Sequence, residues 1–314
     1  NIKDAMRIPQ GKEAVDKEWN KLIKKKAWLY ETVQPRAKVE ADAKKNKKTV
    51  HFGDVMDLCF IKHSQLEQKH WVYKGRIVFR GDQVKDESGY YAVFSEQGTS
   101  ASHLSAAKFL DAIGRMPGNA GQDADATSAY TQVDLDKLSK RKKGRVEETW
   151  IRLPRDRRPK HWDKIDEPVC RLRLNLYGHP LAGLFWQEQC EAAIFANGFE
   201  KIRGWECLYA NYDKQLFLSV YVDAFKLSGK RSNLAPMWKA FTEGEHKLDL
   251  DEPTEFTDNV YLGCFQHEYT PSWQAIEEKS KLYYDLFTRS SEKASSDTRP
   301  DENANNSSPQ LGKA

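Results

Sequence analysis

The sequence predicts a protein of the α+β class. Its helical and strand-like segments are mixed along the chain without strict alternation, and its 314 residues are enough to bury a substantial core. Hydrophobic residues make up 39% of the chain and charged residues 31%, and no apolar run is long enough to cross a bilayer. We therefore expect a water-soluble protein rather than a membrane protein.

A helix is predicted for residues 13–27. Its apolar residues recur at the spacing that lines one helix face, and they are Val15, Trp19, Leu22 and Ile23. Lysines occupy many of the other positions, so the outer face of this helix is expected to be basic. The Ala- and Lys-rich residues 39–49 are predicted to be a connector.

Residues 71–84 are predicted to form a pair of strands. Two sets of side chains alternate along this segment, as in a strand with one apolar face and one basic face. The apolar set is Trp71, Tyr73, Ile77 and Phe79. The basic set is Lys74, Arg76 and Arg80.

Two helices and a hairpin are predicted downstream. One helix begins near Ser102, a residue type suited to capping, and its apolar stripe is Phe109, Leu110, Ile113 and Met116. Another runs from about residue 182 to residue 197, with Trp186, Cys190, Ala193 and Ile194 inward. Residues 216–227 are strongly apolar but contain Asp223, which predicts a buried β-hairpin whose turn presents the aspartate. Residues 289–314 are rich in Ser, Asp and Asn and are predicted to be a disordered tail.

Two aspartates are candidates for binding a cation. An aspartate among the apolar residues of a buried strand is costly unless it binds a proton, a cation or a donor, and Asp223 is such a residue. Asp125 is the second candidate. Carboxylates from two strands can meet and hold hard cations such as Mg²⁺, and a pair of such cations stabilises in-line phosphoryl transfer. Taken singly, each aspartate is more often a turn residue or a helix cap.

A basic block runs from Lys137 to Lys160. It holds eleven Lys or Arg residues and three acidic residues, although the net charge of the whole chain is only +4. Such a block attracts phosphate backbones through counterion release, and an equally good interpretation is a solvated, mobile loop that keeps the protein soluble. The five cysteines form no CxxC pair and the histidines have no zinc-ligand spacing, so we expect reduced thiols in an intracellular protein.

Six short segments occur in an order that has a counterpart in a known family. They are WNKLIKKKAW at 19–28, YKGRIVFRG at 73–81, DATSAY at 125–130, LYG at 176–178 followed by Trp186, YVDA at 221–224 and YLG at 261–263. Each segment is weakly specific, but their succession between about residues 13 and 288 is highly specific. It resembles the reverse-transcriptase domain of copia-type retrotransposons, the RNA-directed DNA polymerase of a Gag-Pol polyprotein.

The resemblance implies a right-hand fold. Residues 1–118 would form the N-terminal helix and the fingers, and residues 119–232 the palm, a four-stranded antiparallel sheet backed by helices. Residues 233–288 would form a thumb-like region before the tail.

The resemblance also implies roles for individual residues. Asp125 and Asp223 would be the catalytic residues and the ligands of two Mg²⁺ ions, which Mn²⁺ can replace. Tyr130 would lie against the sugar of the incoming nucleotide and exclude a 2′-hydroxyl, the alternative being ordinary core packing. The other nucleotide-binding residues would be Lys74, Arg76, Arg80, Tyr177 and Gly178, with a solvated strand edge and a turn as the plain alternatives. The primer grip would be Tyr261, Leu262 and Gly263.

Two departures from the family pattern bear on activity. Where the family has a second aspartate after Asp223, this chain has Ala224, so one expected metal ligand is missing. Pro180, Leu181 and Gly183 stand where the family has Lys, Gln and Pro.

We therefore expect a reverse-transcriptase domain impaired by the loss of one carboxylate, located inside the cell in a cytoplasmic particle or the nucleus. Its partners would be an RNA or DNA template with a primer and deoxynucleoside triphosphates, and no membrane. One alternative is a catalytically dead remnant that still binds template and primer. A more distant alternative is an unrelated α+β protein with structural aspartates. Because the chain begins with Asn1, we expect it to be cut from a longer polypeptide.

Overall fold

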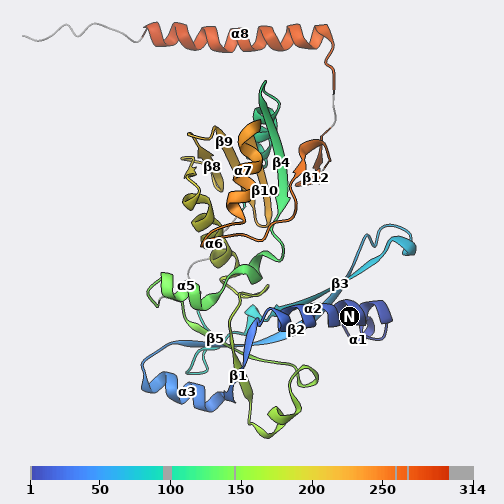
Figure 1. Ribbon diagram of the computed structural model, residues 1–314, viewed down its shortest axis with the longest axis vertical. Coiled ribbons are helices and arrows are strands. Elements are labelled where there is room, and N and C mark those ends of the chain that lie inside the picture. The colour runs from blue at the N-terminus through green and yellow to red at the C-terminus, as the bar shows by residue number, and fades with distance from the viewer. Residues whose placement is uncertain (1, 95–100, 145, 259, 267–268, 297–314) are drawn as a thin grey trace, which may run out of the picture. The chain divides into compact units, whose positions relative to one another are not determined.

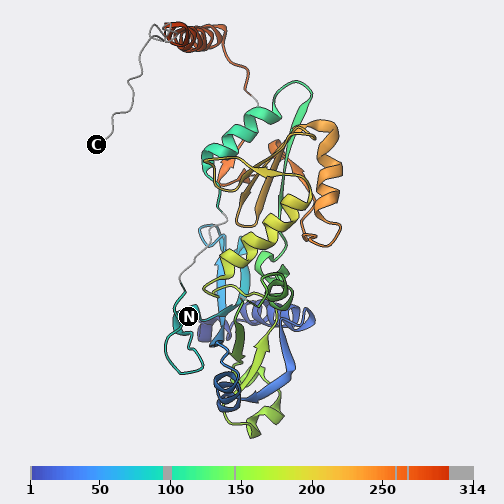
Figure 2. The same ribbon diagram turned by 90° about the vertical axis from the view of Figure 1, so that its left-hand side faces the viewer.

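The computed structural model describes residues 2–94, 101–144, 146–258, 260–266 and 269–296. The chain divides into two compact units, residues 1–265 and residues 266–314. The first unit contains two large β-sheets with helices packed on them, which confirms the α+β class (Figure 1). Both views show the two sheets as separate blocks within this unit (Figures 1 and 2).

The first sheet has five strands in the order β1-β6-β5-β2-β3. They are β1 (Trp28–Pro35), β2 (Val50–Lys62), β3 (Val72–Phe79), β5 (Glu148–Arg152) and β6 (Pro168–Leu172). All neighbours are antiparallel except the pair of β2 and β5. Strands β5 and β6 lie within residues 119–232, the segment predicted to form the palm, and they pair here with strands from residues 1–118. The side chains of Trp150 and Ile151 on β5 are apolar and buried, as is typical of a strand that lies between two others in a sheet.

Helix α2 (Pro9–Lys24), which follows the short helix α1 (Ile2–Ala5), packs along β3. Val15, Trp19 and Leu22 are at most 2% exposed, as their spacing predicted, whereas Ile23 is 40% exposed and does not belong to the buried face. The backbone of α2 lies directly on β3 because Gly75 has no side chain: a Cβ there would lie 2.4 Å from the carbonyl oxygen of Ala14.

Two predictions in this region are wrong. Residues 71–84 contribute a single strand, β3, whose partner is β2 rather than a second strand within the segment. Helix α3 (Arg36–Lys45) takes up most of the predicted connector and buries Val39 and Ala43 in a small core with Phe52 and Trp150. Alternation of apolar and polar side chains along a segment indicates a strand, but it does not indicate which distant strand pairs with that segment.

The second sheet is antiparallel and has the order β11-β4-β10-β9-β8-β7. Its strands are β4 (Asn119–Asp125), β7 (Glu200–Lys201), β8 (Leu208–Asn211), β9 (Leu216–Tyr221), β10 (Ala224–Lys230) and β11 (Thr254–Glu255). The predicted hairpin at residues 216–227 is confirmed as β9 and β10. The short strands β7 and β11 form its two edges.

Helices cover both faces of the second sheet. Helix α4 (Leu104–Gly114) packs on one face and α7 (Arg231–Phe241) on the opposite one, as Figure 2 shows. Helix α6 (Ala182–Ala196) confirms the predicted helix, and α5 (Leu135–Arg141) overlaps the start of the basic block. Helix α7 covers residues 233–241, which were predicted to begin the thumb-like region, and it packs on β4 and β10.

Helix α4 differs in part from its prediction. Leu110 is buried, but Phe109 and Met116 are 39% and 54% exposed. Ser102 does not cap the helix, because its hydroxyl group is hydrogen-bonded to that of Ser219 at 2.7 Å.

The end of the first unit holds the small hairpin of β12 (Val260–Tyr261) and β13 (Cys264–Phe265). The second unit contains α8 (Trp273–Ser296), which continues past residue 289, where the disordered tail was predicted to begin. The rest of that predicted tail, residues 297–314, lies outside the described residues. Within the described ranges, no helix combines the length and the apolar character needed to span a membrane.

Candidate active site

Asp125 and Asp223 lie next to each other, where β4 ends and the β9–β10 hairpin turns. The backbone N–H of Ala126 donates to the carbonyl oxygen of Asp223 at 2.7 Å, so the two segments are in direct contact. Partial desolvation raises the pKa of Asp125, and the negative charges of Asp223 and Asp251 raise it further. Carboxylates therefore repel one another here, which is the electrostatic condition that a bound cation relieves.

The turn that carries Asp223 is strained. Tyr221 pairs with Ala224, so the loop is only Val222 and Asp223. Val222 has a φ of +56°, which is unfavourable for a β-branched residue. The indole N–H of the buried Trp186 donates to the carbonyl oxygen of Val222 at 2.6 Å and holds the turn in place. Such strain, maintained by the surrounding structure, is a feature of functional sites.

Ala224 is paired directly with Asp125 across β4 and β10. Directly opposed residues of neighbouring strands project from the same face of a sheet, with Cβ atoms about 4.5–5.5 Å apart. A carboxylate at position 224 would thus stand beside that of Asp125, where this chain has a methyl group.

Asp251 was not predicted, and it also reaches this site. Its backbone N–H donates to the carbonyl oxygen of Asp125 at 2.8 Å, and its carboxylate accepts from the Thr127 hydroxyl at 2.8 Å. The sequence has three acidic residues at 249, 251 and 252, but nothing in it indicates that this segment returns to β4. Within the part of the chain that the structure describes, no group of three or more His, Cys, Asp or Glu side chains is arranged to hold a metal ion.

Aromatic and cationic side chains predicted to bind the nucleotide come together beside the two turns. The rings of Tyr130 and Tyr177 are 4.6 Å apart, and the Arg76 guanidinium lies 4.5 Å from the Tyr177 ring centre. The backbone of Tyr177 accepts a hydrogen bond from Phe79 at 2.8 Å. Gly178 is required there, because it has a φ of +84° and a Cβ would lie 2.1 Å from the Phe79 carbonyl oxygen.

The three predicted basic residues are not equivalent. Lys74 and Arg76 lie on β3 and are close enough for the charge of Arg76 to lower the pKa of Lys74, after the larger effect of burial. Arg80 follows the end of β3 and pairs with Asp82 in the next turn at 3.1 Å. The structure therefore brings Arg76 to the tyrosines, whereas Arg80 is engaged elsewhere.

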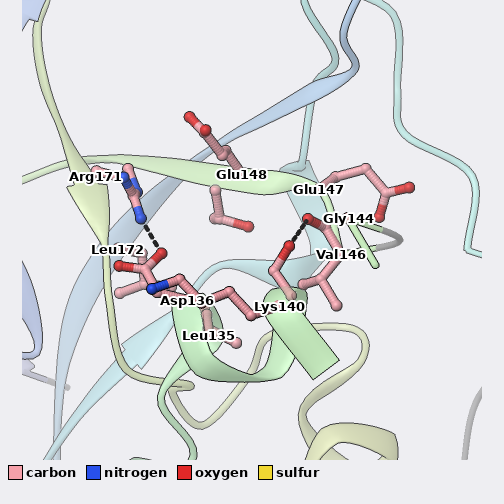
Figure 3. Close-up of a pocket in the computed structure, with 11 residues that line it drawn as sticks. Leu135, Asp136, Lys140, Gly144, Val146, Glu147, Glu148, Arg171 and Leu172 are labelled. Carbon is pink, nitrogen blue, oxygen red and sulfur yellow. Dashed lines mark hydrogen bonds and ion pairs between the residues drawn. The ribbon is translucent and has the colours of Figure 1, made fainter. Parts of the chain in front are cut away.

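A pocket between α5 and the strands β5 and β6 is separate from these residues. It has a volume of about 460 Å³, and no residue of the six motifs lines it (Figure 3). Its wall carries charges of both signs, and an ion pair between Arg171 and Asp136 lies on it. We therefore place the candidate site at the two aspartate turns and not in this pocket.

The sequence comparisons identify the family of the chain. Residues 42–263 match the profile of a family described as reverse transcriptase (RNA-dependent DNA polymerase). The chain belongs to the reverse transcriptase family.

The curated relatives of this reverse transcriptase come from copia-type elements, which confirms the resemblance seen in the motifs. The Transposon Ty1-DR4 Gag-Pol polyprotein of Saccharomyces cerevisiae is 26% identical over 224 residues, which are 70% of this chain and 12% of that protein. The Transposon Ty1-BL Gag-Pol polyprotein of the same yeast is 27% identical over 222 residues, 70% of this chain and 11% of that protein. The chain thus spans only a small part of the relatives it matches. Reverse transcriptases in general use divalent metal ions.

The residues predicted to form the primer grip of this reverse transcriptase lie in the β12–β13 hairpin. Leu262 and Gly263 form its two-residue turn and have φ values of +49° and +75°. Tyr261 is 6% exposed, and its hydroxyl lies 3.4 Å from the carbonyl oxygen of Ala224. The hairpin is therefore in contact with the strand that follows the Asp223 turn.

A buried ion pair of the reverse transcriptase was also missed by sequence reasoning. Lys226, which is 1% exposed, lies 2.8 Å from Asp111 and 3.2 Å from Asp123. Its ammonium group is also 3.5 Å from the Phe256 ring centre and 4.6 Å from that of Tyr261. Burial raises the pKa of Asp123 to about 6, although Lys226 opposes this shift. This cluster joins α4, the sheet and the segment that leads into the β12–β13 hairpin.

His179, which follows Tyr177 and Gly178, is buried as a neutral ring. Its Nδ1 accepts from the backbone N–H of Leu181 at 3.2 Å, and its Nε2 lies 3.4 Å from the Thr149 hydroxyl. Burial, together with a smaller effect of the charge of His51, lowers the pKa of His179 to about 3. This histidine links the loop after Tyr177 to strand β5.

The burial of His179 predicts a loss of stability in acid. Because its pKa is about 3 in the folded chain and about 6.5 in the unfolded chain, its contribution is complete above pH 6.5 and decreases as the pH falls below that value. Between pH 7 and pH 5 the unfolding free energy of the wild type should fall by about 2 kcal/mol more than that of His179→Gln. Urea titrations at the two pH values measure the difference, and equal losses in the two proteins would contradict it.

Proposed function

We propose that this chain is the template-directed DNA polymerase domain of a copia-type retrotransposon, and that Ala224 impairs its activity. The observation that carries the proposal is the contact between the Asp125 and Asp223 turns beside the Tyr130, Tyr177 and Arg76 cluster. Its partners would be an RNA or DNA template with a primer and deoxynucleoside triphosphates, inside the cell in a cytoplasmic particle or the nucleus.

The two sheets suggest how the fold corresponds to a right hand. The first sheet with α2 would be the fingers, and the second sheet with α4, α6 and α7 would be the palm. The thumb-like region would then begin after α7 rather than at residue 233.

The side chains at the candidate site supply some, but not all, of the ligands expected for two divalent cations. Asp125 and Asp223 offer the oxygen ligands that Mg²⁺ and Mn²⁺ prefer, and their mutual repulsion favours a bound cation. When bound, a pair of such ions would neutralise charge at the attacking and leaving oxygens of the phosphoryl transfer. Ala224 supplies no third carboxylate, so the fit is incomplete.

The chain's own residues would position the substrates. The primer 3′-hydroxyl would attack the α-phosphate of the nucleotide, and pyrophosphate would leave. Lys74 and Arg76 would hold the phosphates, Tyr177 would support the nucleotide, and the Tyr130 ring would exclude a 2′-hydroxyl from the sugar site. The hairpin of Tyr261 would hold the primer end. Such positioning accounts for most of the protein's role in phosphoryl transfer.

Extension of a labelled primer by one nucleotide tests this function. Any rate that the wild-type chain shows should be lost in Asp223→Ala, because that change removes the only carboxylate of the Val222-Asp223 turn. Asp213→Ala, on the turn between β8 and β9, is the matched control and should leave the rate unchanged. A rate that survives Asp223→Ala would contradict the proposed role of the site.

A second candidate function is template and primer binding without synthesis. Ala224 favours it, because a site that lacks one carboxylate can still retain the cationic surfaces that contact phosphates. Part of the basic block supplies such a surface. Lys142 and Arg152 are engaged with Glu188 and Asp54, but Lys137, Lys140 and Lys143 are exposed.

Both functions predict nucleic-acid binding that weakens as salt rises. In fluorescence anisotropy with a labelled primer–template, replacing Lys137, Lys140 and Lys143 with Gln should lower the slope of log K against log salt by about 2–3, since each phosphate contact contributes about 0.9. Replacing the exposed Lys44, Lys45 and Lys47, in and just after α3, is the matched control. An unchanged slope would mean that the exposed lysines of the block only keep the protein soluble.

A further inference from the structure

Helix α2 brings a lysine to the candidate site from outside the part of the chain that the family profile covers. The profile begins at residue 42, whereas α2 ends at Lys24. The ammonium group of the half-buried Lys21 donates to the hydroxyl of Ser128, three residues after Asp125. Ser128 itself has a left-handed backbone, with a φ of +54°. Lys21 is therefore anchored at the turn that leaves the first catalytic aspartate.

Lys21 joins a group of cations that converge from two elements. Gly75 allows the backbone of α2 to lie against β3, and the residues on either side of that glycine are Lys74 and Arg76. The charges of Arg76, Lys62 and Lys21 lower the pKa of Lys74, after the larger effect of burial and against the opposing charge of Glu18. Lys25, the residue directly after α2, has its ammonium group 3.4 Å from the Thr131 hydroxyl.

These cations are not neutralised by close ion pairs. Within the described residues, neither Lys21, Lys74 nor Arg76 forms an ion pair with a carboxylate. Placing like charges together and partly out of water is unfavourable unless an anion joins them. A tri- or pyrophosphate carries several negative charges on a short chain and suits such a group, and lysine is a common point-charge ligand for phosphate.

We propose that Lys21 binds the terminal phosphates of the incoming deoxynucleoside triphosphate together with Lys74 and Arg76, which makes α2 a part of the nucleotide site. This inference rests on the proposed function. It explains why α2 packs over Gly75, and it gives the basic face of this helix a specific ligand.

The test compares two lysines of the same helix. Lys21→Gln removes the proposed phosphate ligand and keeps a polar side chain, whereas Lys24→Gln makes the same charge change at an exposed position. Calorimetry in a buffer that contains Ca²⁺ measures two affinities. One is for inorganic tripolyphosphate, and the other is for dTTP in the presence of primer–template. Lys21→Gln should weaken both about tenfold and leave the affinity for primer–template alone unchanged. Lys24→Gln should change each affinity less than about twofold, and Lys21→Arg should recover most of the loss.

The outcomes separate this inference from the proposed function. If both variants bind dTTP and primer–template, and if their affinities for dTTP are equal, the role of Lys21 is overturned while the proposed function stands. Weaker binding of primer–template by Lys21→Gln would also overturn it, because Lys21 would then be a nucleic-acid contact. A wild-type chain that binds neither dTTP nor primer–template would overturn both proposals. Thermal melting of the variants confirms that each is folded.

Discussion

Replacing Ala224 with aspartate is expected to raise Mg²⁺-dependent nucleotide incorporation by at least about tenfold, a change of roughly 1.4 kcal/mol in the activation barrier. Position 224 is paired with Asp125, so the new carboxylate would stand on the same face of the sheet and beside the existing one. A metal held by fewer charges is less well placed, and an error of about 1 Å in position can reduce a rate on the order of a hundredfold. Single-nucleotide primer extension at matched protein concentrations measures the effect.

Ala224→Asn is the control for this prediction. It introduces a side chain of nearly the same shape without the charge, so it should not raise the rate. Ala224→Asp should also melt at a lower temperature without Mg²⁺ than with it, because Asp125, Asp223 and Asp251 already repel one another. Equal extension rates in the wild type and Ala224→Asp would show that another group, such as Asp251, already replaces the missing carboxylate.

Replacing Lys226 with methionine is expected to lower the free energy of unfolding by about 3–5 kcal/mol, the range measured when one partner of a buried ion pair is removed. Asp123 is 2% exposed, and it would lose the ammonium group that offsets its burial. The contacts of Lys226 with the rings of Phe256 and Tyr261 would be lost as well. Urea-induced unfolding at pH 7 measures the change.

The double variant Lys226→Met with Asp123→Leu shows whether the loss of unfolding free energy comes from the unpaired charge of Asp123. Replacing a buried ion pair with apolar residues is often close to neutral, and the other partner of Lys226, Asp111, is 26% exposed and can be solvated, so the double variant should recover most of the lost stability. Lys230→Met, at the exposed end of the same strand, is the matched control and should cost less than about 0.5 kcal/mol. A loss of less than about 1 kcal/mol in Lys226→Met would show that the ammonium group is not needed to stabilise Asp123.

Elements with a clear local pattern were predicted well. The apolar run around Asp223 predicted the β9–β10 hairpin, and the spacing of Trp186, Cys190 and Ile194 predicted α6. Predictions failed where the partner of a segment was distant. β3 pairs with β2 and not within its own segment, and the predicted connector is α3, because pairing and packing depend on residues far away in the chain.

The sequence by itself determined the family of this chain, and it named two candidate aspartates and the departure at position 224, because short motifs carry these features directly. Only the tertiary structure decided which side chains meet at the site. Lys21 reaches Ser128 across 107 residues, and Lys226 reaches Asp123 across 103 residues. A buried lysine and a helix lysine have no distinguishing local pattern, since their surroundings are formed by segments that the fold brings together. Side-chain periodicity specifies which face of an element is buried, but the packing of whole elements decides what that face contacts.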